Sequence, residues 1–335
     1  MRRSRRPALL TLLLTASLAL TACGGSSDEL VVYSGRGQDL IGPLLERFNE
    51  ETGIPIAVRY GDSSDLALLL DEEGDATDAD VVITQNPGAV AFLSERGRLA
   101  TLDDDLLALV EPRFESSTGT WVGLSGRQRV FVYNQDLIGE DELPESVFDL
   151  VEPEWQGRFA VAPPNGSFQD FVSLMRLEVG DDATRDWLEG IVANDVRTYP
   201  NNNSIVDAVA RGEVEFGLVN HYYNYRFLEE DPSLPSRNHV PEGDVGSMVI
   251  VSTASVVSGT DQPDAAEQLL RFLLSEESQT YFTTETFEYP LVAGVAASPE
   301  LPSLADQELP VVDFDALGDE LRSTVELIDA SGLRN

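Results

Sequence analysis

Short apolar runs alternate with segments of helical periodicity along most of this chain, and that alternation restricts the fold more than any other feature. The runs have the length of buried strands, and the segments between them repeat apolar residues three and four positions apart, as helices that cover a sheet do. The pattern predicts an α/β architecture. We expect strands at residues 30–33, 54–60, 80–84, 129–133, 158–162, 214–219 and 245–253, and helices at 41–51, 66–73, 89–96, 168–178, 183–192, 205–211, 265–274 and 317–328.

The length of 335 residues suits two lobes better than a single core. Two extended apolar segments flanked by glycine, 123–133 and 243–251, are candidates for a chain that crosses between lobes. If both cross, the lobes are discontinuous in sequence, and we expect a ligand cleft between them at the carboxyl ends of the strands. The predicted division assigns 29–126 plus 248–300 to the first lobe and 127–247 plus 301–335 to the second.

Residues 1–22 have the pattern of an export signal, with four arginines followed by an apolar run of 13 residues from Ala8 to Leu20. A membrane-spanning helix needs about 20 residues, so this run is too short to be one. The stretch Leu20-Thr21-Ala22-Cys23 resembles the lipobox of bacterial lipoproteins, which implies that Cys23 is acylated and anchors the chain to the outer face of the cytoplasmic membrane. Residues 23–28 then read as a flexible tether. A plain secretory peptide is the alternative, and both the Sec and the twin-arginine route stay open.

Acidic residues outnumber basic ones, 59 to 22, for a formal net charge of −37, and every basic residue is an arginine. Such a surface repels nucleic acid and anionic lipid, so we expect no nucleic-acid partner. It favours cations in the encounter step. Adaptation of the whole surface to a salty habitat explains the charge equally well.

The chain lacks the residue patterns of the common enzyme classes. It has two histidines, His221 and His239, and a single cysteine, and it contains no nucleophile elbow, phosphate loop, dinucleotide fingerprint or HExxH motif. We therefore expect a binding protein and not an enzyme. A secreted hydrolase with a carboxylate pair is the alternative from another class, although no acids stand in a recognisable constellation.

The sequence Asn220-His221-Tyr222-Tyr223-Asn224-Tyr225 directly follows a predicted strand. A phenol has an ordinary pKa of about 10, and a bound cation can displace its proton. Two adjacent phenolates would select a hard trivalent ion such as Fe(III). Both could reach one ion only at a turn or in the first turn of a helix, and the pattern predicts a turn here. The alternative is a tyrosine pair that packs between helix and sheet.

Several further motifs, in a shared order and spacing, accompany this pair: LVVYSG at 30–35, ADVVIT at 79–84, GLSGRQRVFVY at 123–133 and EYPL at 288–291. With them the mature chain resembles the ferric-ion-binding solute receptors of ABC importers, sometimes called bacterial transferrins. The resemblance implies a type II periplasmic-binding-protein fold of two lobes that close on the ligand. It also implies a monomer that delivers iron to a membrane permease powered by a separate ATPase.

In that family the phenolate ligands fall on Tyr222 and Tyr223, and an exogenous anion, phosphate or carbonate, completes the iron site. The anion cradle falls on Asn165-Gly166-Ser167, Asn202 and Asn220. A helix start attracts an anion without net positive charge, although Asn165-Gly166-Ser167 taken alone reads as an ordinary helix cap. Arg36 or Arg127 could clamp the anion through two hydrogen bonds, or form a salt bridge instead. His221 is expected to be structural.

The first lobe departs from the family pattern. Gly37 stands where many members have a histidine, Gln85 replaces a frequent glutamate, and Phe168 occupies a position where some relatives add a tyrosine. The predicted site therefore relies on two phenolates and the bound anion. The runner-up is the same fold binding an organic anion such as a phosphonate, or another metal.

Overall fold

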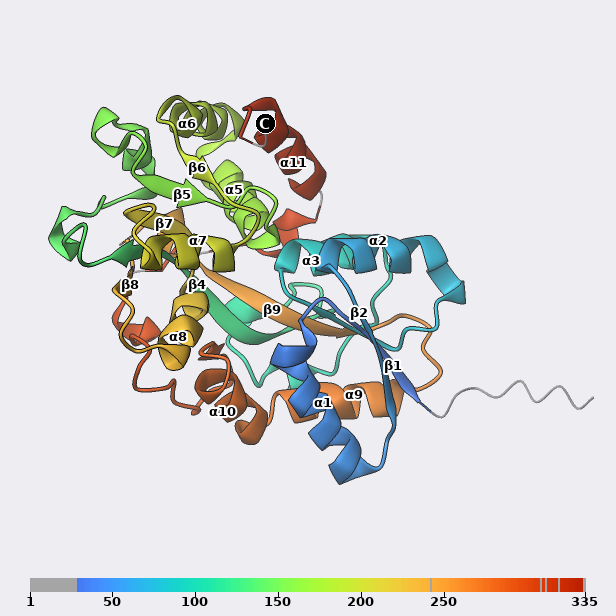
Figure 1. The fold of residues 1–335 in the computed structure, drawn as a ribbon. Helices are drawn as coiled ribbons and strands as arrows, with labels where there is room; N and C mark the ends of the chain where they lie inside the picture. The colour runs from blue at the N-terminus through green and yellow to red at the C-terminus, as the bar shows by residue number, and fades with distance from the viewer. Residues whose placement is uncertain (1–28, 242, 308, 311, 319, 334–335) are drawn as a thin grey trace, which may run out of the picture.

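The computed structural model describes residues 29–241, 243–307, 309–310, 312–318 and 320–333, so the predicted export signal, Cys23 and the tether lie outside the described residues. Strands and helices alternate along this part of the chain, which confirms the predicted α/β architecture (Figure 1). The strands are β1 Leu30–Ser34, β2 Ile56–Tyr60, β3 Val81–Thr84, β4 Val122–Asn134, β5 Phe159–Val161, β6 Arg197–Thr198, β7 Phe216–Asn220, β8 Ser236–His239, β9 Val249–Val256 and β10 Tyr289–Pro290.

The helices follow the apolar periodicity of the sequence, and most of their expected positions are correct to within a few residues. They are α1 Gln38–Thr52, α2 Ser63–Glu73, α3 Pro87–Glu95, α4 Asp104–Leu107, α5 Gly166–Val179, α6 Asp181–Ala193, α7 Asn202–Ala210, α8 His221–Glu230, α9 Pro263–Leu273, α10 Glu276–Thr284 and α11 Glu320–Ala330. Asn165 and Asn201 cap α5 and α7 through their side-chain oxygens, which fixes where these two helices begin.

Hydrogen bonding connects the strands in the order β2-β1-β3-β9-β4-β7-β5-β6, with β8 and β10 also paired to β4. β1 is parallel to β2 and β3, and β5 is parallel to β6 and β7, while β9 and β4 run antiparallel to their neighbours. We call the part around β1, β2, β3 and β9 the first lobe and the part around β5, β6, β7 and β8 the second lobe.

Strand β4 belongs to both lobes. Residues 122–128 pair with β9 of the first lobe, and residues 129–134 pair with β7 and β8 of the second. All 13 residues of this strand are buried, because helices or neighbouring strands cover it along its whole length. The return from β8 to β9 passes through residues 240–248, at the second predicted crossover. The residue boundaries predicted for the lobes stay a prediction.

Helices cover both faces of the sheet. Figure 1 shows α1 and α9 on one side of the first lobe and α2 and α3 on the other, and α5, α6 and α11 form a layer over the second lobe. The side chains that face these helices are almost all aliphatic or aromatic, and they form one large core that runs through both lobes.

Two local expectations are wrong, and helix α10 was not predicted. Residues 245–247 form a 3-10 turn, because Asp244 caps them by accepting a hydrogen bond from the Gly246 N–H, and β9 begins only at Val249. The predicted helix at 317–328 begins at Glu320, after a short 3-10 turn at 315–317. Helix α10 was not expected, because its first turn is acidic and its apolar residues are few.

Candidate ligand-binding cleft

Tyr222 and Tyr223 lie in the first turn of α8, directly after the last residue of β7. Their rings stack with centroids 4.1 Å apart and planes inclined by 29°. Tyr222 is 1% exposed, whereas Tyr223 is half-buried. The turn between strand and helix thus sets two consecutive phenols side by side, where a continuing strand would have pointed them to opposite faces.

Burial raises the pKa of Tyr222 well above its ordinary value, and the neighbouring Tyr223 raises it further. The positive charge of Arg127 acts in the opposite direction, and the carboxylate of Glu288 adds to the rise. Tyr222 is therefore a neutral phenol at physiological pH unless a cation takes the place of its proton. Such a site discriminates against weak Lewis acids, because only a strongly charged ion offsets the cost of a buried phenolate.

The predicted anion cradle is brought together at the starts of α5 and α7. Asn165 accepts hydrogen bonds from the backbone N–H of Ser167 at 3.1 Å and from its hydroxyl at 2.6 Å. The side-chain amide of Asn202 donates to the same hydroxyl at 3.3 Å and to the Asn165 oxygen at 3.4 Å. A Cβ added at Gly166 would make only ordinary contacts with Asn86, so space alone does not require glycine there.

Arg129 connects this cluster to Asn220, although it is not among the site residues predicted from the sequence. Its guanidinium donates to the Ser167 hydroxyl at 3.2 Å, to the Asn220 side-chain oxygen at 3.1 Å and to the Leu218 carbonyl at 3.1 Å. The residue is fully buried, and burial lowers its pKa to about 9, partly opposed by Tyr223. It therefore stays charged at neutral pH.

Arg127 lies two residues earlier on β4 and is also buried, at 1% exposure. Its terminal nitrogen donates to the Val251 carbonyl at 3.2 Å, and its Nε has no hydrogen-bond partner among the described residues. Arg36 differs, because it forms a buried ion pair with Glu288 at 3.0 Å and donates to Ser125 at 3.3 Å. Of the two arginines predicted as anion clamps, Arg127 retains the larger capacity for a ligand.

The first lobe reaches the cleft through the end of β3. Asn86 donates to the Asp170 carboxylate on α5 at 3.5 Å, which links the two lobes. Burial raises the pKa of Asp170 to about 7, and Asn86 and the two arginines moderate the rise. Gln85, the residue that replaces the family glutamate, has a buried side-chain oxygen without a partner among the described residues. Gly37 precedes α1 and offers no side-chain ligand.

His221 is buried beside the tyrosine pair, and its Nε2 has no hydrogen-bond partner among the described residues. Its Nδ1 accepts a hydrogen bond from the Gln128 backbone N–H at 3.0 Å, and its ring packs on Tyr289 at a centroid distance of 4.8 Å. Burial lowers the pKa of the imidazole to about 3, so the ring is neutral at physiological pH. Phe168 is likewise buried, against Phe171.

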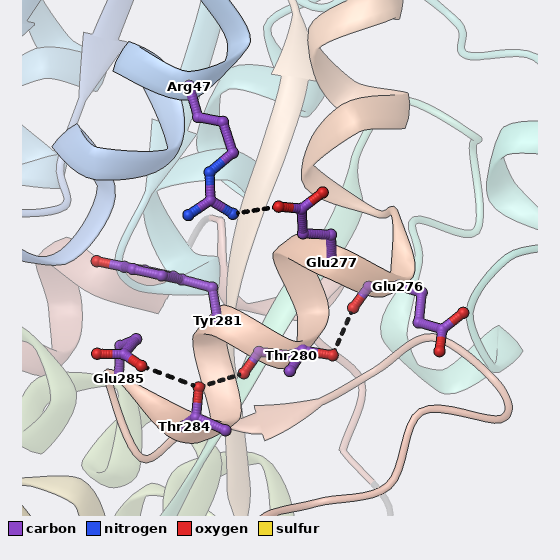
Figure 2. A pocket seen from close by; sticks show the side chains of 7 residues that line it. All are labelled: Arg47, Glu276, Glu277, Thr280, Tyr281, Thr284 and Glu285. Carbon is purple, nitrogen blue, oxygen red and sulfur yellow. Dashed lines mark hydrogen bonds and ion pairs between the residues drawn. The ribbon is translucent and has the colours of Figure 1, made fainter. Parts of the chain in front are cut away.

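No group of three histidine, cysteine, aspartate or glutamate residues that could hold a metal occurs within the described ranges. A surface hollow of about 680 Å³ lies between α1 and α10, on the first lobe alone (Figure 2). Glutamates and threonines of α10 and its carboxyl end line the hollow, and Arg47 pairs with Glu277 there at 2.7 Å. Since no side chain of the second lobe contributes, we distinguish it from the cleft.

Residues 77–319 match the family of bacterial extracellular solute-binding proteins. The chain belongs to this family. It is 32% identical to the Fe(3+)-binding periplasmic protein of Serratia marcescens, over 94% of both chains. Its fold superposes on iron-bound HitA from Pseudomonas aeruginosa with a TM-score of 0.86 and 35% identity, over 91% of this chain and 99% of HitA.

A Trichodesmium protein solved with iron and citrate is 26% identical, with a TM-score of 0.80, and the match covers 91% of this chain and 99% of that one. These likenesses confirm the two-lobed periplasmic-binding-protein fold and the resemblance to ferric-binding receptors drawn from the motifs. As a solute-binding protein, the chain binds its ligand without transforming it. The phosphonate alternative is not favoured, since these relatives are named for iron. Among the described residues no helix is long and apolar enough to cross a membrane.

Proposed function

We propose that this solute-binding protein captures Fe(III) outside the cytoplasmic membrane, with Tyr222 and Tyr223 as phenolate ligands. The observation that carries the proposal is the stacked pair at 4.1 Å, held at the start of α8 beside a cluster of buried hydrogen-bond donors. Oxygen anions are the donors that a hard trivalent ion prefers. The relatives named for ferric-ion binding support the same ligand.

The charges of the cleft favour an accompanying anion. Arg127 and Arg129 are both buried on β4 and form no ion pair with a carboxylate within 4 Å among the described residues. Adding a trivalent ion to two guanidiniums requires more negative charge than two phenolates provide. Phosphate or carbonate, bound by Arg127, Asn165, Gly166, Ser167, Asn202 and Asn220, supplies it. Arg36 acts in this scheme through its pair with Glu288 and not as a direct clamp.

The first lobe contributes weakly to the metal in this proposal. Gln85 offers a neutral amide oxygen and Gly37 offers none, so the metal depends on the second lobe and the anion. The expected consequence is iron binding that responds strongly to the anion present. Two lobes, divided near the boundaries predicted from the sequence, close on the ligand, and contacts from both lobes favour the closed form.

We further propose where the protein acts and which partners receive its ligand. Cys23 is acylated after export and anchors a monomer to the outer face of the cytoplasmic membrane. The loaded protein docks on an ABC permease, which a separate ATPase powers. The family and the periplasmic relatives support export and uptake, and the lipobox-like sequence supports the anchor.

A visible spectrum tests the metal site. Phenolate ligands give ferric complexes a charge-transfer band, so iron-free protein supplied with ferric citrate and phosphate should turn coloured with one ion per chain. Tyr222→Phe and Tyr223→Phe should each weaken or abolish the band and the binding of iron. Tyr225→Phe is the matched control, because Tyr225 lies on the same helix as the pair but its ring stacks on Phe287. A colourless wild-type protein, or full colour in both single variants, contradicts the proposal.

A further inference from the structure

Arg129 is a buried cation that forms no ion pair with a carboxylate among the described residues. The side chain is 0% exposed, its three hydrogen bonds go to neutral oxygens, and its guanidinium lies 5.5 Å from the centroid of the Phe171 ring. The carboxylate of Asp170 acts on it only from beyond ion-pair distance. A buried cation that lacks a paired anion destabilises a fold, and an apolar side chain of similar volume would destabilise it less. The position therefore points to a role for this residue in binding.

The guanidinium holds the ends of two separate elements. In the pairing of β4 with β7, Arg129 lies opposite Asn220, the last residue before α8. The same nitrogen that donates to Asn220 at 3.1 Å also donates to Ser167, in the first turn of α5, at 3.2 Å. One side chain thus fixes the starts of α5 and α8 relative to each other.

This contact also determines which end of the Asn220 amide faces the cleft. A guanidinium can only donate hydrogen bonds, so the oxygen of the amide must face Arg129. The amide nitrogen then faces away, and it is buried without a partner among the described residues. The Ser167 hydroxyl is oriented in the same manner, since it accepts from Arg129 and Asn202 and donates to Asn165 at 2.6 Å.

We propose that Arg129 is the positioning residue of the anion cradle: it turns Asn220 so that the amide nitrogen donates to an oxygen of the anion bound beside Tyr222 and Tyr223. The inference rests on the proposed function, because it assigns a role within that site. It predicts that the anion requires a hydrogen-bond donor at position 220, and not merely a residue of suitable size.

Asn220→Asp is the most direct test. Aspartate keeps an oxygen for Arg129, so the fold retains this contact as an ion pair, but its second oxygen replaces the donor that faces the anion. Phosphate should no longer strengthen ferric binding in this variant, even at about ten times the concentration that half-saturates the wild type, since a hydrogen bond to a charged group is lost and a repulsion is added. The melting temperature of the iron-free variant should not fall.

Two substitutions of Arg129 separate its charge from its shape. Arg129→Lys keeps the charge, but its single terminal nitrogen cannot replace both guanidinium nitrogens, one of which donates to Ser167 and Asn220 and the other to the Leu218 carbonyl. Arg129→Gln removes the charge. Both should raise the half-saturating phosphate concentration, by about tenfold for glutamine. Arg176→Gln is the matched control: it removes a second-lobe arginine whose side chain is 8% exposed and which pairs with Asp181 and Glu320 away from the cleft.

The inference is overturned if Asn220→Asp and the Arg129 variants respond to phosphate as the wild type does, whatever their melting temperatures. If the Arg129 variants lose as much stability as Arg176→Gln and their response to phosphate is unchanged, Arg129 is a purely structural residue. If Tyr222→Phe loses its colour while the Asn220 and Arg129 variants keep the wild-type response to phosphate, this inference is contradicted and the proposed function is not. A wild-type protein that binds no ferric ion contradicts the proposed function and this inference with it.

Discussion

Burial shifts the pKa values of several residues of the cleft away from their ordinary values in water. Asp170 is the clearest case, because its pKa is raised to about 7 and one of its oxygens has no partner among the described residues. In the unfolded chain an aspartate ionises near pH 4. The folded protein therefore binds more protons at this site between about pH 4 and pH 7 than the unfolded chain does.

Linkage then gives the direction of the stability change at this residue. The contribution of Asp170 to the free energy of unfolding is greatest below pH 4 and is lost as the pH rises through about 7. The free energy of unfolding of Asp170→Asn, taken relative to that of the wild type, should therefore increase by about 2 to 3 kcal/mol as the pH rises from 5 to 8. Urea unfolding of the iron-free proteins across this range measures the difference.

Asp181→Asn is the control for this comparison. Its carboxylate is exposed and its pKa is lowered by Arg176, so it stays ionised throughout the range and its difference from the wild type should not vary with pH. A parallel course of the Asp170→Asn and wild-type curves would show that Asp170 does not titrate in this range.

At the scale of elements, the sequence predicted what depends on local periodicity. The strands β1, β3 and β7 and the helices α1, α5 and α7 follow directly from apolar patterns, and the tyrosine pair was found because it follows a strand. Arg129 was missed because an arginine in an apolar strand has no local meaning until its partner strand is known. Two arginines, Arg127 and Arg129, inside a segment predicted to cross between lobes were the available signal. The Asn86–Asp170 contact joins positions 84 residues apart, which no local pattern reveals.

Helix α7 lies on β7 at a distance that only glycine permits. A Cβ at Gly217 would come within 2.4 Å of the Ile205 Cγ2 and 3.2 Å of the Ala160 carbonyl oxygen. Gly217→Ala should therefore push α7 and its first residue Asn202 away from the cleft. We expect a loss of about 1 to 3 kcal/mol in the free energy of unfolding, together with weaker phosphate dependence of ferric binding.

Gly42→Ala is a suitable comparison, since a Cβ at this α1 position meets only the flexible Gln38 side chain at 3.2 Å and the Tyr60 hydroxyl at 3.6 Å. Alanine favours a helix interior over glycine, so this variant should keep or gain stability. Removing the obstructing methyl in the double variant Gly217→Ala/Ile205→Ala should destabilise less than the two single effects added together. Strict additivity would show that the two side chains do not meet.

At the scale of the whole molecule, an ion pair connects α8 of the second lobe to α1 of the first. Arg226 of α8 contacts Asp39 of α1 at 3.0 Å, with the two side chains 37% and 61% exposed. A pair this exposed contributes at most about 1 kcal/mol and is weakened by salt. Asp39→Asn should therefore accelerate removal of ferric ion by citrate a few-fold, and added sodium chloride should accelerate the wild type but not the variant.

The Arg47–Glu277 pair offers a closely matched control. Its nitrogen–oxygen distance is 2.7 Å and its side chains are 36% and 62% exposed, but both residues belong to the first lobe. Glu277→Gln should leave the rate of iron removal unchanged. Equal acceleration by both substitutions would mean that surface charge in general, and not the contact between lobes, controls release.

The shared strand β4 has a mechanical consequence. Its hydrogen-bonding partner changes from β9 to β7 between Gln128 and Arg129, so any bending of the molecule at this crease moves Arg127 relative to Arg129. The positive charges of Arg127 and Arg129 repel each other at this point of β4, and the repulsion favours a bend that moves the two lobes apart. If the proposed anion binds between the two guanidiniums, it cancels this repulsion. Loss of the anion would then favour opening of the two lobes, so that ligand release and opening would be coupled without a separate trigger.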